Sequence, residues 1–321
     1  MGEFQSIGQW WMWASFGLFV IAMLAIDILA LGRKGAHKVS TKEALVWSLI
    51  WFTLALAFGG ALWAWLDHTS GRTIADAKAM EYLTGYLLEK TLAMDNIFVF
   101  VMLFTYFAVP MEYQKRVLVY GVLGAIILRA LMILLGAWLI AEFHWVLYVF
   151  GAFLLITGIK MFIFADKEPN LAQNPLLKWL KKHMRITDTY HGDKFWVTKN
   201  GVRWFTPMFL VLILVEFSDV IFAMDSIPAI FAITSDPFIV FTSNIFAILG
   251  LRALYFLLAD MADRFHLLKY GLAVVLMFVG TKMLIVEWFK IPVAVSLAVV
   301  VAVLGISILL SLKSTQHKNL R

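Results

Sequence analysis

Apolar residues fill most of this chain in long stretches that polar connections separate. About 20 apolar residues in an α-helix cross the hydrocarbon core of a bilayer, which is about 30 Å thick. The pattern therefore predicts an all-α membrane protein with nine transmembrane helices. They are expected at residues 10–31, 44–66, 81–107, 117–141, 145–165, 206–233, 238–259, 266–288 and 290–312.

The overall composition supports this prediction. Of the 321 residues, 62% are hydrophobic and only 15% are charged, and the mean hydropathy is +0.85. A soluble domain is nearer to half apolar and a quarter charged. We therefore expect a single membrane domain over residues 1–321, surrounded by a lipid bilayer.

Lysine and arginine are distributed unevenly between the two sets of connections. The connections 32–43, 108–116, 166–205 and 260–269 and the tail 313–321 hold 19 of them, whereas the opposite set holds only Arg72, Lys78 and Lys290. Because basic loops stay in the cytoplasm, the N-terminus is predicted to be periplasmic and the C-terminus cytoplasmic. The net charge of +6 is thus mostly explained by topology, and no nucleic-acid partner is expected.

Residues 166–205 form the one extended polar connection, which resembles a linker more than a catalytic domain. Within it, residues 176–184 predict a basic helix that lies on the lipid surface. Residues 195–205 predict a short β-hairpin that turns at Asn200 and Gly201.

Two parts of the chain repeat in the same order. The sequence L-R-A-L at 128–131 recurs at 251–254, and G-I-K-M at 158–161 recurs as G-T-K-M at 280–283. Each copy holds three predicted helices, so the second copy (206–288) is expected to be inverted relative to the first (81–165), with peripheral helices at 10–66 and 290–312. Inverted repeats are typical of transporters, with the substrate site near the midplane between the copies.

The repeat also places paired carboxylates inside apolar segments. E-K-T-L-A-M-D-N at 89–96 aligns with D-V-I-F-A-M-D-S at 219–226, so each copy has two acids six residues apart. A carboxylate at the bilayer centre costs about 2.5–3.5 kcal/mol and is seldom there without a function. We predict a cation site with the ligands Glu89, Asp95, Asp219 and Asp225, with Glu216 as a further ligand or a proton acceptor. Neutral oxygens are expected from Asn96, Ser218, Ser226 and Asn244.

Five bases lie in the same predicted interior: Lys90, Arg129, Lys160, Arg252 and Lys282. One interpretation is that acids and bases pair only to hold the helices together, although buried ion pairs contribute little stability. The other is that Arg129 and Arg252 neutralise the acids while the site is empty and move away when a cation enters. Lys160 and Lys282 lie toward one end of their helices, from which a lysine is able to reach the interface.

Helix geometry separates the acids of the second motif. Glu216 and Asp219 share a face, whereas Asp225 lies about half a turn away. Pro228 lacks a backbone donor. A helix broken there is one way to bring Asp225 round to Asp219, and a simple kink is the alternative.

The predicted ligands suit a hard divalent ion. The chain has no cysteine, and carboxylate and amide oxygens bind Mg²⁺, Ca²⁺ or Mn²⁺. A thioether from Met94 or Met224 would favour Mn²⁺, although methionine is also an ordinary packing residue. No P-loop, G-x-S-x-G or H-E-x-x-H pattern occurs, so neither an enzyme nor a resident cofactor is expected.

With these motifs in place, the chain resembles the TerC family of integral membrane proteins, especially its alkali-induced Alx branch. The most specific parts are V-E-F-S-D-V-I-F-A-M-D-S-I-P-A-I-F-A-I-T at 215–234 and F-W-V-T-K-N-G at 195–201. Departures are methionine for valine before each aspartate, and Phe217 where relatives often have leucine. The resemblance implies a bacterial inner-membrane protein related to the LysE-type exporters, with Mn²⁺ efflux, metal supply to secreted proteins or tellurite resistance as its function. It also implies that the five acids are essential.

The leading hypothesis is therefore a secondary transporter that exports Mn²⁺. One alternative is a membrane adaptor or stress protein of the redox-modulator type, in which the buried charges are structural and the 166–205 connection carries the function. Another is an exchanger of H⁺ or Na⁺ that uses the same carboxylates. The coupling ion, homo-oligomerisation and partners in the secretion machinery are left open by the sequence.

Overall fold

The structure is a computed structural model that describes residues 6–34, 40–143, 145–164, 174–259 and 267–319, without the side chains of 27–34, 94–95, 312 and 315–319. Its helices are α1 (Trp10–Lys34), α2 (Thr41–Ser70), α3 (Arg72–Tyr106), α4 (Met111–Glu142), α5 (Val146–Ile163), α6 (Pro175–His183), α7 (Pro207–Phe231), α8 (Pro237–Leu249), α9 (Leu251–Leu258), α10 (Leu268–Leu284) and α11 (Val293–Asn319). The strands β1 (Trp196–Lys199) and β2 (Val202–Phe205) form a hairpin before α7. The all-α membrane class is thus confirmed.

The described helices include five that are long and apolar enough to cross a membrane, namely α2, α4, α5, α7 and the Val293–Ser311 part of α11. The bent pair of α8 and α9 makes a sixth if it is counted as one span. Outward positions of α4 such as Ile127, Leu131 and Leu134 are more than half exposed, as expected for a surface that lipid covers. The count of nine crossings stays a prediction.

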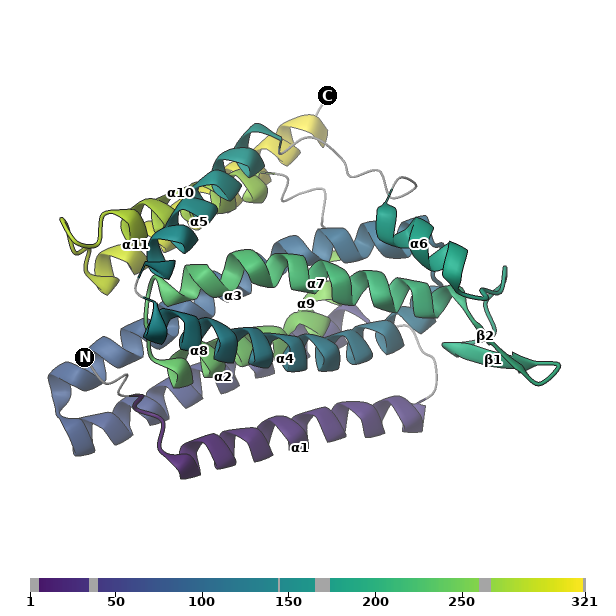
Figure 1. Cartoon of the computed structure of the whole chain (residues 1–321), viewed down its shortest axis with the longest axis horizontal. Helices are drawn as coiled ribbons and strands as arrows, with labels where there is room; N and C mark the ends of the chain where they lie inside the picture. Colours follow the sequence, from purple (N-terminus) through teal and green to yellow (C-terminus); the bar gives the residue numbers. More distant parts are fainter. Residues whose placement is uncertain (1–5, 35–39, 144, 165–173, 260–266, 320–321) are drawn as a thin grey trace.

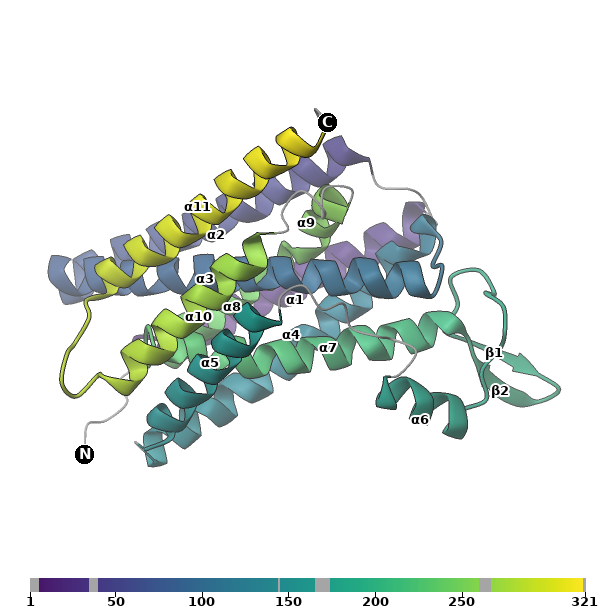
Figure 2. The same ribbon diagram turned by 90° about the horizontal axis from the view of Figure 1, so that it is seen from above.

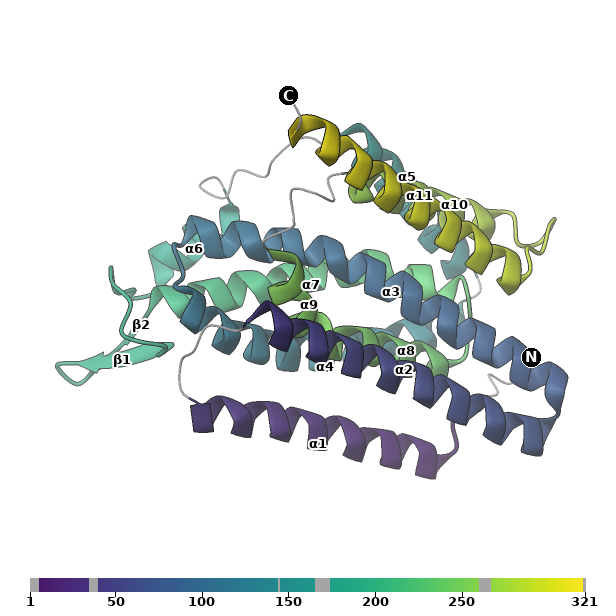
Figure 3. The same ribbon diagram turned by 180° about the vertical axis from the view of Figure 1, so that it is seen from behind.

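The helices lie side by side in a bundle with distinct ends (Figures 1 and 2). In both views α6 and the hairpin lie at the right-hand end, and the turn between α2 and α3 lies at the left-hand end. Helices α5, α10 and α11 gather on one side of the bundle, and α1 lies on the opposite side (Figures 1 and 3). Between them, α3 packs against α7 and α8, and α7 also packs against α4.

Small residues let α5 and α10 approach closely. A Cβ added at Gly151 would lie 3.1 Å from the carbonyl oxygen of Gly280, and one at Gly158 would lie 2.9 Å from the carbonyl oxygen of Ala273. In the alignment of the two repeats, Gly151 corresponds to Ala273 and Gly158 to Gly280. The two contacts are therefore reciprocal.

The hairpin predicted in the linker is confirmed. Trp196 pairs with Phe205 and Lys199 with Val202, and the two residues between the strands have positive φ angles, 50° at Asn200 and 73° at Gly201. This is the turn geometry that Asn-Gly favours, because its twist matches that of the strands.

The linker also packs on the bundle. The hydroxyl of Tyr190 donates to the carbonyl oxygen of Phe107 at 2.5 Å, and burial raises the pKa of Tyr190 to about 12, so this donor keeps its proton at neutral pH. Leu177 and Leu180 of α6 are buried in an apolar cluster with residues of α3, α4 and α7. The prediction that α6 lies on lipid is therefore wrong for its apolar face, because these leucines, three residues apart, turn toward protein.

Helix α7 continues through Pro228 to Phe231, so of the two alternatives considered for this proline, the broken helix is wrong. Pro228 lies within the last turn, where few later residues depend on its geometry. The chain bends instead by 40° between α8 and α9, at Gly250. Lys90 lies at this bend. Its Nζ donates to the carbonyl oxygen of Ala247 at 3.3 Å, and a Cβ at Gly250 would lie only 2.5 Å from the same Nζ.

Candidate cation site

Arg129 of α4 lies at the centre of a buried polar network and is only 1% exposed. Its Nη2 and Nε donate to the two carboxylate oxygens of Asp219 on α7, at 2.9 and 3.2 Å. Its Nη1 forms an ion pair with Glu89 on α3. One guanidinium thus joins carboxylates from both predicted repeats, and its contact with Asp219 has the two-pronged geometry that makes arginine pairs strong.

Neutral groups complete the network. The same Nη1 donates to Ser226 Oγ at 3.3 Å and to Asn244 Oδ1 on α8 at 3.2 Å. Asn244 Nδ2 donates in turn to Glu89 Oε2 at 3.0 Å, and Asn96 Nδ2 donates to Asp219 Oδ1 at 3.4 Å. All of these side chains are buried. The network therefore ties together α3, α4, α7 and α8.

The spacing of the residues explains why they meet. Glu89 and Asn96 are seven residues apart on α3, and Asp219 and Ser226 are seven apart on α7. Seven residues are close to two helical turns, so each pair presents an acid and a neutral group on one face. The two pairs are equivalent positions of the repeat, and each helix contributes one acid to Arg129, whereas Ser226 accepts from Arg129 and Asn96 donates to Asp219.

Electrostatics make this centre a place for a cation. Glu89 and Asp219 carry two negative charges and share one guanidinium. A buried carboxylate without a positive partner is costly, so the space between these acids favours a positive group. A bound metal ion would find there two carboxylates and the amide oxygen of Asn244, ligands that Mg²⁺, Ca²⁺ and Mn²⁺ accept.

A cavity of about 400 Å³ reaches this network. It lies between α3, α4 and α7 on one side and α5 and α10 on the other. Its polar lining consists of Asn96, Arg129, Thr157, Lys160, Asp225 and Ser226. The remaining lining is apolar and includes Phe164, which is 47% exposed. Arg129 therefore borders both the buried network and the cavity.

The other predicted ligands lie outside the Arg129 network. Asp225 is half-buried and faces the cavity. Glu216 is half-buried against α4, where the absence of a side chain at Gly124 leaves space for its carboxylate. The side chains of Asp95 and Met94 are not among those described. Among the described residues, no group of three or more acids and histidines is arranged to hold a metal.

The five predicted bases differ in their surroundings. Arg129 pairs with two acids, as expected. Lys282 is 8% exposed and its Nζ donates to Ser296 Oγ at 3.0 Å, whereas Lys90 binds a backbone carbonyl. Lys160 is exposed and lines the cavity. Arg252 is the second residue of α9 and is half-buried. Its pairing with an acid stays a prediction.

Two further findings concern residues beside the acids. Met224 is 50% exposed and points away from the network, so the structure gives no support to its thioether as a ligand. Thr157 on α5 lines the cavity together with Asp225. No pattern in the sequence points to Thr157, because its spacing does not show that α5 faces α7.

These features define an integral multi-pass membrane protein whose helices enclose an ionic centre. The family model described as "Integral membrane protein TerC family" matches residues 74–319. The chain therefore belongs to the TerC family.

The relatives extend over almost the whole chain. A protein of Escherichia coli K12, provisionally named membrane-bound redox modulator Alx, is 57% identical over 306 residues that cover 95% of each chain. The protein of Salmonella typhi with the same name is 56% identical over the same share of both chains. An uncharacterised membrane protein of Myxococcus xanthus, STKORF319, is 49% identical over 99% of this chain and 97% of its own. No solved structure matches the chain.

Proposed function

We propose that the chain is a secondary transporter that exports Mn²⁺ across a bacterial inner membrane. The observation that carries this proposal is the position of Arg129. Its guanidinium lies between Glu89 and Asp219, beside a cavity that Asp225 also lines. An intramembrane acid is by default a functional residue, and here the acids hold an internal cation that an external one is able to replace.

The exchange of one cation for another supplies the two states that a transporter needs. With Arg129 between the acids, one of their two negative charges is balanced, and the helices can move without an ion. A divalent ion that enters past Asp225 brings two positive charges to Glu89 and Asp219, and the guanidinium is released toward the cavity. Because either the guanidinium or the ion lies between the acids, the empty site and the occupied site have different side-chain arrangements.

The helix packing supports an inverted repeat. Helix α3 of the first copy packs on α8 of the second, and α7 of the second packs on α4 of the first. When the two copies are interchanged, the close contact of Gly151 with Gly280 becomes the contact of Ala273 with Gly158. Such pairs are expected if the two copies are related by an axis in the membrane plane, with the substrate site where they meet.

The position of the cavity indicates the side of the membrane from which an ion reaches the site. Lys160 and Phe164 line it from the end of α5 that lies nearer to the C-terminus, where α5 and α10 diverge from α3 and α7 (Figure 1). The basic connections favour a cytoplasmic position for this end under the positive-inside rule. The structure then corresponds to a transporter that is open to the cytoplasm, ready to load an ion for export.

The resemblance to exporters of the family favours Mn²⁺ over Mg²⁺ and Ca²⁺ as the transported ion. The described oxygen ligands fit all three ions. The Alx relatives carry a redox name, but this chain has no cysteine and thus no thiol of its own to oxidise. An adaptor with purely structural charges and an H⁺ or Na⁺ exchanger stay as alternatives.

Flux measurements on reconstituted protein test the proposal. Proteoliposomes with the wild-type chain should move Mn²⁺ down its gradient, and Asp225→Asn should abolish this flux without loss of folded protein. Asp76→Asn is the matched control, because it changes an exposed acid in the first turns of α3. This variant should transport normally.

Three outcomes contradict the proposal in different ways. Equal flux in wild-type and Asp225→Asn proteoliposomes rules out the cavity acid as part of the path. Movement of protons on a Na⁺ gradient in metal-free vesicles favours the exchanger. No transport of any ion, together with loss of cellular function when residues 174–205 are deleted, favours the adaptor.

A further inference from the structure

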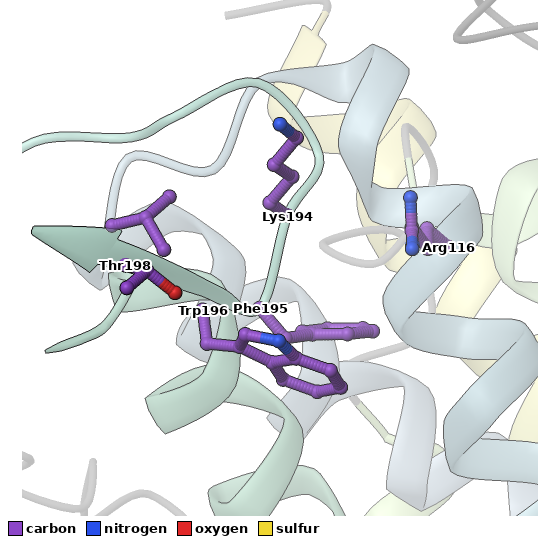
Figure 4. Close-up of a pocket in the computed structure, with 6 residues that line it drawn as sticks. Arg116, Lys194, Phe195, Trp196 and Thr198 are labelled. Carbon is purple, nitrogen blue, oxygen red and sulfur yellow. The ribbon is translucent and has the colours of Figure 1, made fainter. Parts of the chain in front are cut away.

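A second pocket, of about 540 Å³, lies at the hairpin end of the molecule and is separate from the cation site. It is lined by Arg116, Lys194, Phe195, Trp196, Val197 and Thr198. Figure 4 shows the Arg116 and Lys194 side chains on two sides of it, with the rings of Phe195 and Trp196 close together near Arg116. We propose that this pocket binds the phosphate-bearing headgroup of an anionic phospholipid.

Arg116 is held ready for such a ligand. Its Nη1 binds Asp193 Oδ2 at 2.5 Å, and its guanidinium lies over the rings of Phe195 and Tyr120, at 5.4 and 5.9 Å. The Nε of Arg116 is buried and has no hydrogen-bond partner among the described residues. Nη1 is the only nitrogen of this guanidinium with a hydrogen-bond partner among the described residues, so the group is held in place while Nη2 remains for phosphate oxygens.

Lys194 supplies a second positive charge at the pocket. Its side chain is exposed, while its backbone carbonyl accepts a hydrogen bond from Thr206 Oγ1 at 2.6 Å, which fixes this part of the chain next to α7. The hydroxyl of Thr198 is a further donor at the pocket. The lining of the pocket thus contains two positive charges and a hydroxyl group, and Asp193 opposes only one of the charges.

The wider surface has the sign that an anionic membrane attracts. Residues 174–206 contain seven lysines and arginines and two aspartates. A basic side chain at an anionic membrane surface contributes about 1 kcal/mol, which is about fivefold in affinity. Trp179 and Trp196 are both about half exposed, as aromatic residues at a membrane interface often are.

The position of the pocket favours a lipid over free phosphate. Arg116 stands in the first turns of α4, and the apolar span of this helix follows directly. Tyr120 packs edge-on against Phe195 at the pocket, and the exposed residues Ile127 and Leu131 continue from Tyr120 along one face of α4. A headgroup in the pocket would therefore leave its acyl chains along an apolar stripe.

Binding of a short-chain lipid to the purified full-length protein tests this proposal. Calorimetry with dihexanoyl phosphatidylglycerol should show binding at least about tenfold tighter than with dihexanoyl phosphatidylcholine. Arg116→Gln/Lys194→Gln should remove this preference, because two basic side chains account for about 25-fold. Lys178→Gln/Lys199→Gln removes the same charge elsewhere on the surface and is the matched control, expected to keep the preference.

The Lys194→Gln single variant guards against misfolding, because it leaves the ion pair of Arg116 with Asp193 intact. It should weaken phosphatidylglycerol binding about fivefold. Equal binding of the two lipids, or unchanged affinity in the single variant, would overturn the proposal. Inorganic phosphate that binds as tightly as phosphatidylglycerol would also overturn it and would indicate a site for a free anion. None of these outcomes depends on whether the chain transports an ion.

Discussion

Two buried charges of this protein, Arg129 and Lys282, show how different a functional centre and a structural contact are. Arg129 touches carboxylates from two helices and borders a cavity. Lys282 donates to the hydroxyl of Ser296 on α11, and it does not line that cavity. Both are basic residues of repeated motifs within apolar segments, so their motifs alone do not tell them apart. Burial of a charge therefore does not by itself mark a site, and the partners and the adjacent space decide.

The largest effect is expected for Arg129→Gln. Removal of the guanidinium leaves Glu89 and Asp219 buried without their cation, which should cost about 3–5 kcal/mol of stability. Thermal unfolding in detergent measures this loss. Adding Mn²⁺ should restore part of the stability, because the ion takes the place of the guanidinium. The double variant Arg129→Gln/Asp219→Asn should be more stable than Arg129→Gln; a further loss would show that the pair is not coupled.

Glu81→Gln changes a polar contact in the N-terminal part of α3, outside the Arg129 network. Glu81 accepts hydrogen bonds from Lys78 at 2.9 Å and from Thr234 at 2.5 Å. The amide keeps one acceptor, so a cost of about 1–2 kcal/mol is expected. Mn²⁺ flux per folded molecule should be unchanged. A loss of flux at normal stability would place this contact in the transport path.

Lys282→Met should have a smaller effect than Arg129→Gln. It keeps the length of the side chain but removes the hydrogen bond to Ser296 and the charge attraction to Glu81, so about 1–2 kcal/mol of stability is at stake. Flux should stay at the wild-type level, in contrast to Arg129→Gln. If Lys282→Met abolished flux while the protein remained folded, the distinction between the two buried charges would fail.

Met224→Leu should have almost no effect. The side chain is 50% exposed and points away from the Arg129 network, and leucine replaces it at similar volume. The ratio of Mn²⁺ to Mg²⁺ flux is the appropriate readout. A lower preference for Mn²⁺ would mean that the thioether binds the ion in some other state of the transporter.

The sequence predicts the composition of the centre better than its shape. The seven-residue spacing of Glu89 with Asn96 and of Asp219 with Ser226 already places each pair on one face, and the equal numbers of acids and bases predict internal pairing. The TerC family resemblance, drawn from these motifs, is confirmed by the family model and by the relatives.

What the sequence leaves out depends on how helices cross. Periodicity defines a face of a helix but not the neighbour that this face meets. The bend at Gly250 instead of at Pro228 is one example, because the contact of Lys90 with the carbonyl of Ala247 at this bend comes from another helix. The cavity is another, because its walls come from segments that are far apart in the sequence.

The central claim is that a divalent cation replaces Arg129 between Glu89 and Asp219. Anomalous scattering from crystals of the wild-type protein soaked in Mn²⁺ tests it directly. An anomalous peak is expected within bonding distance of both carboxylates, with the guanidinium turned away toward the cavity. Crystals that show no peak there and keep Arg129 between the two acids would contradict it.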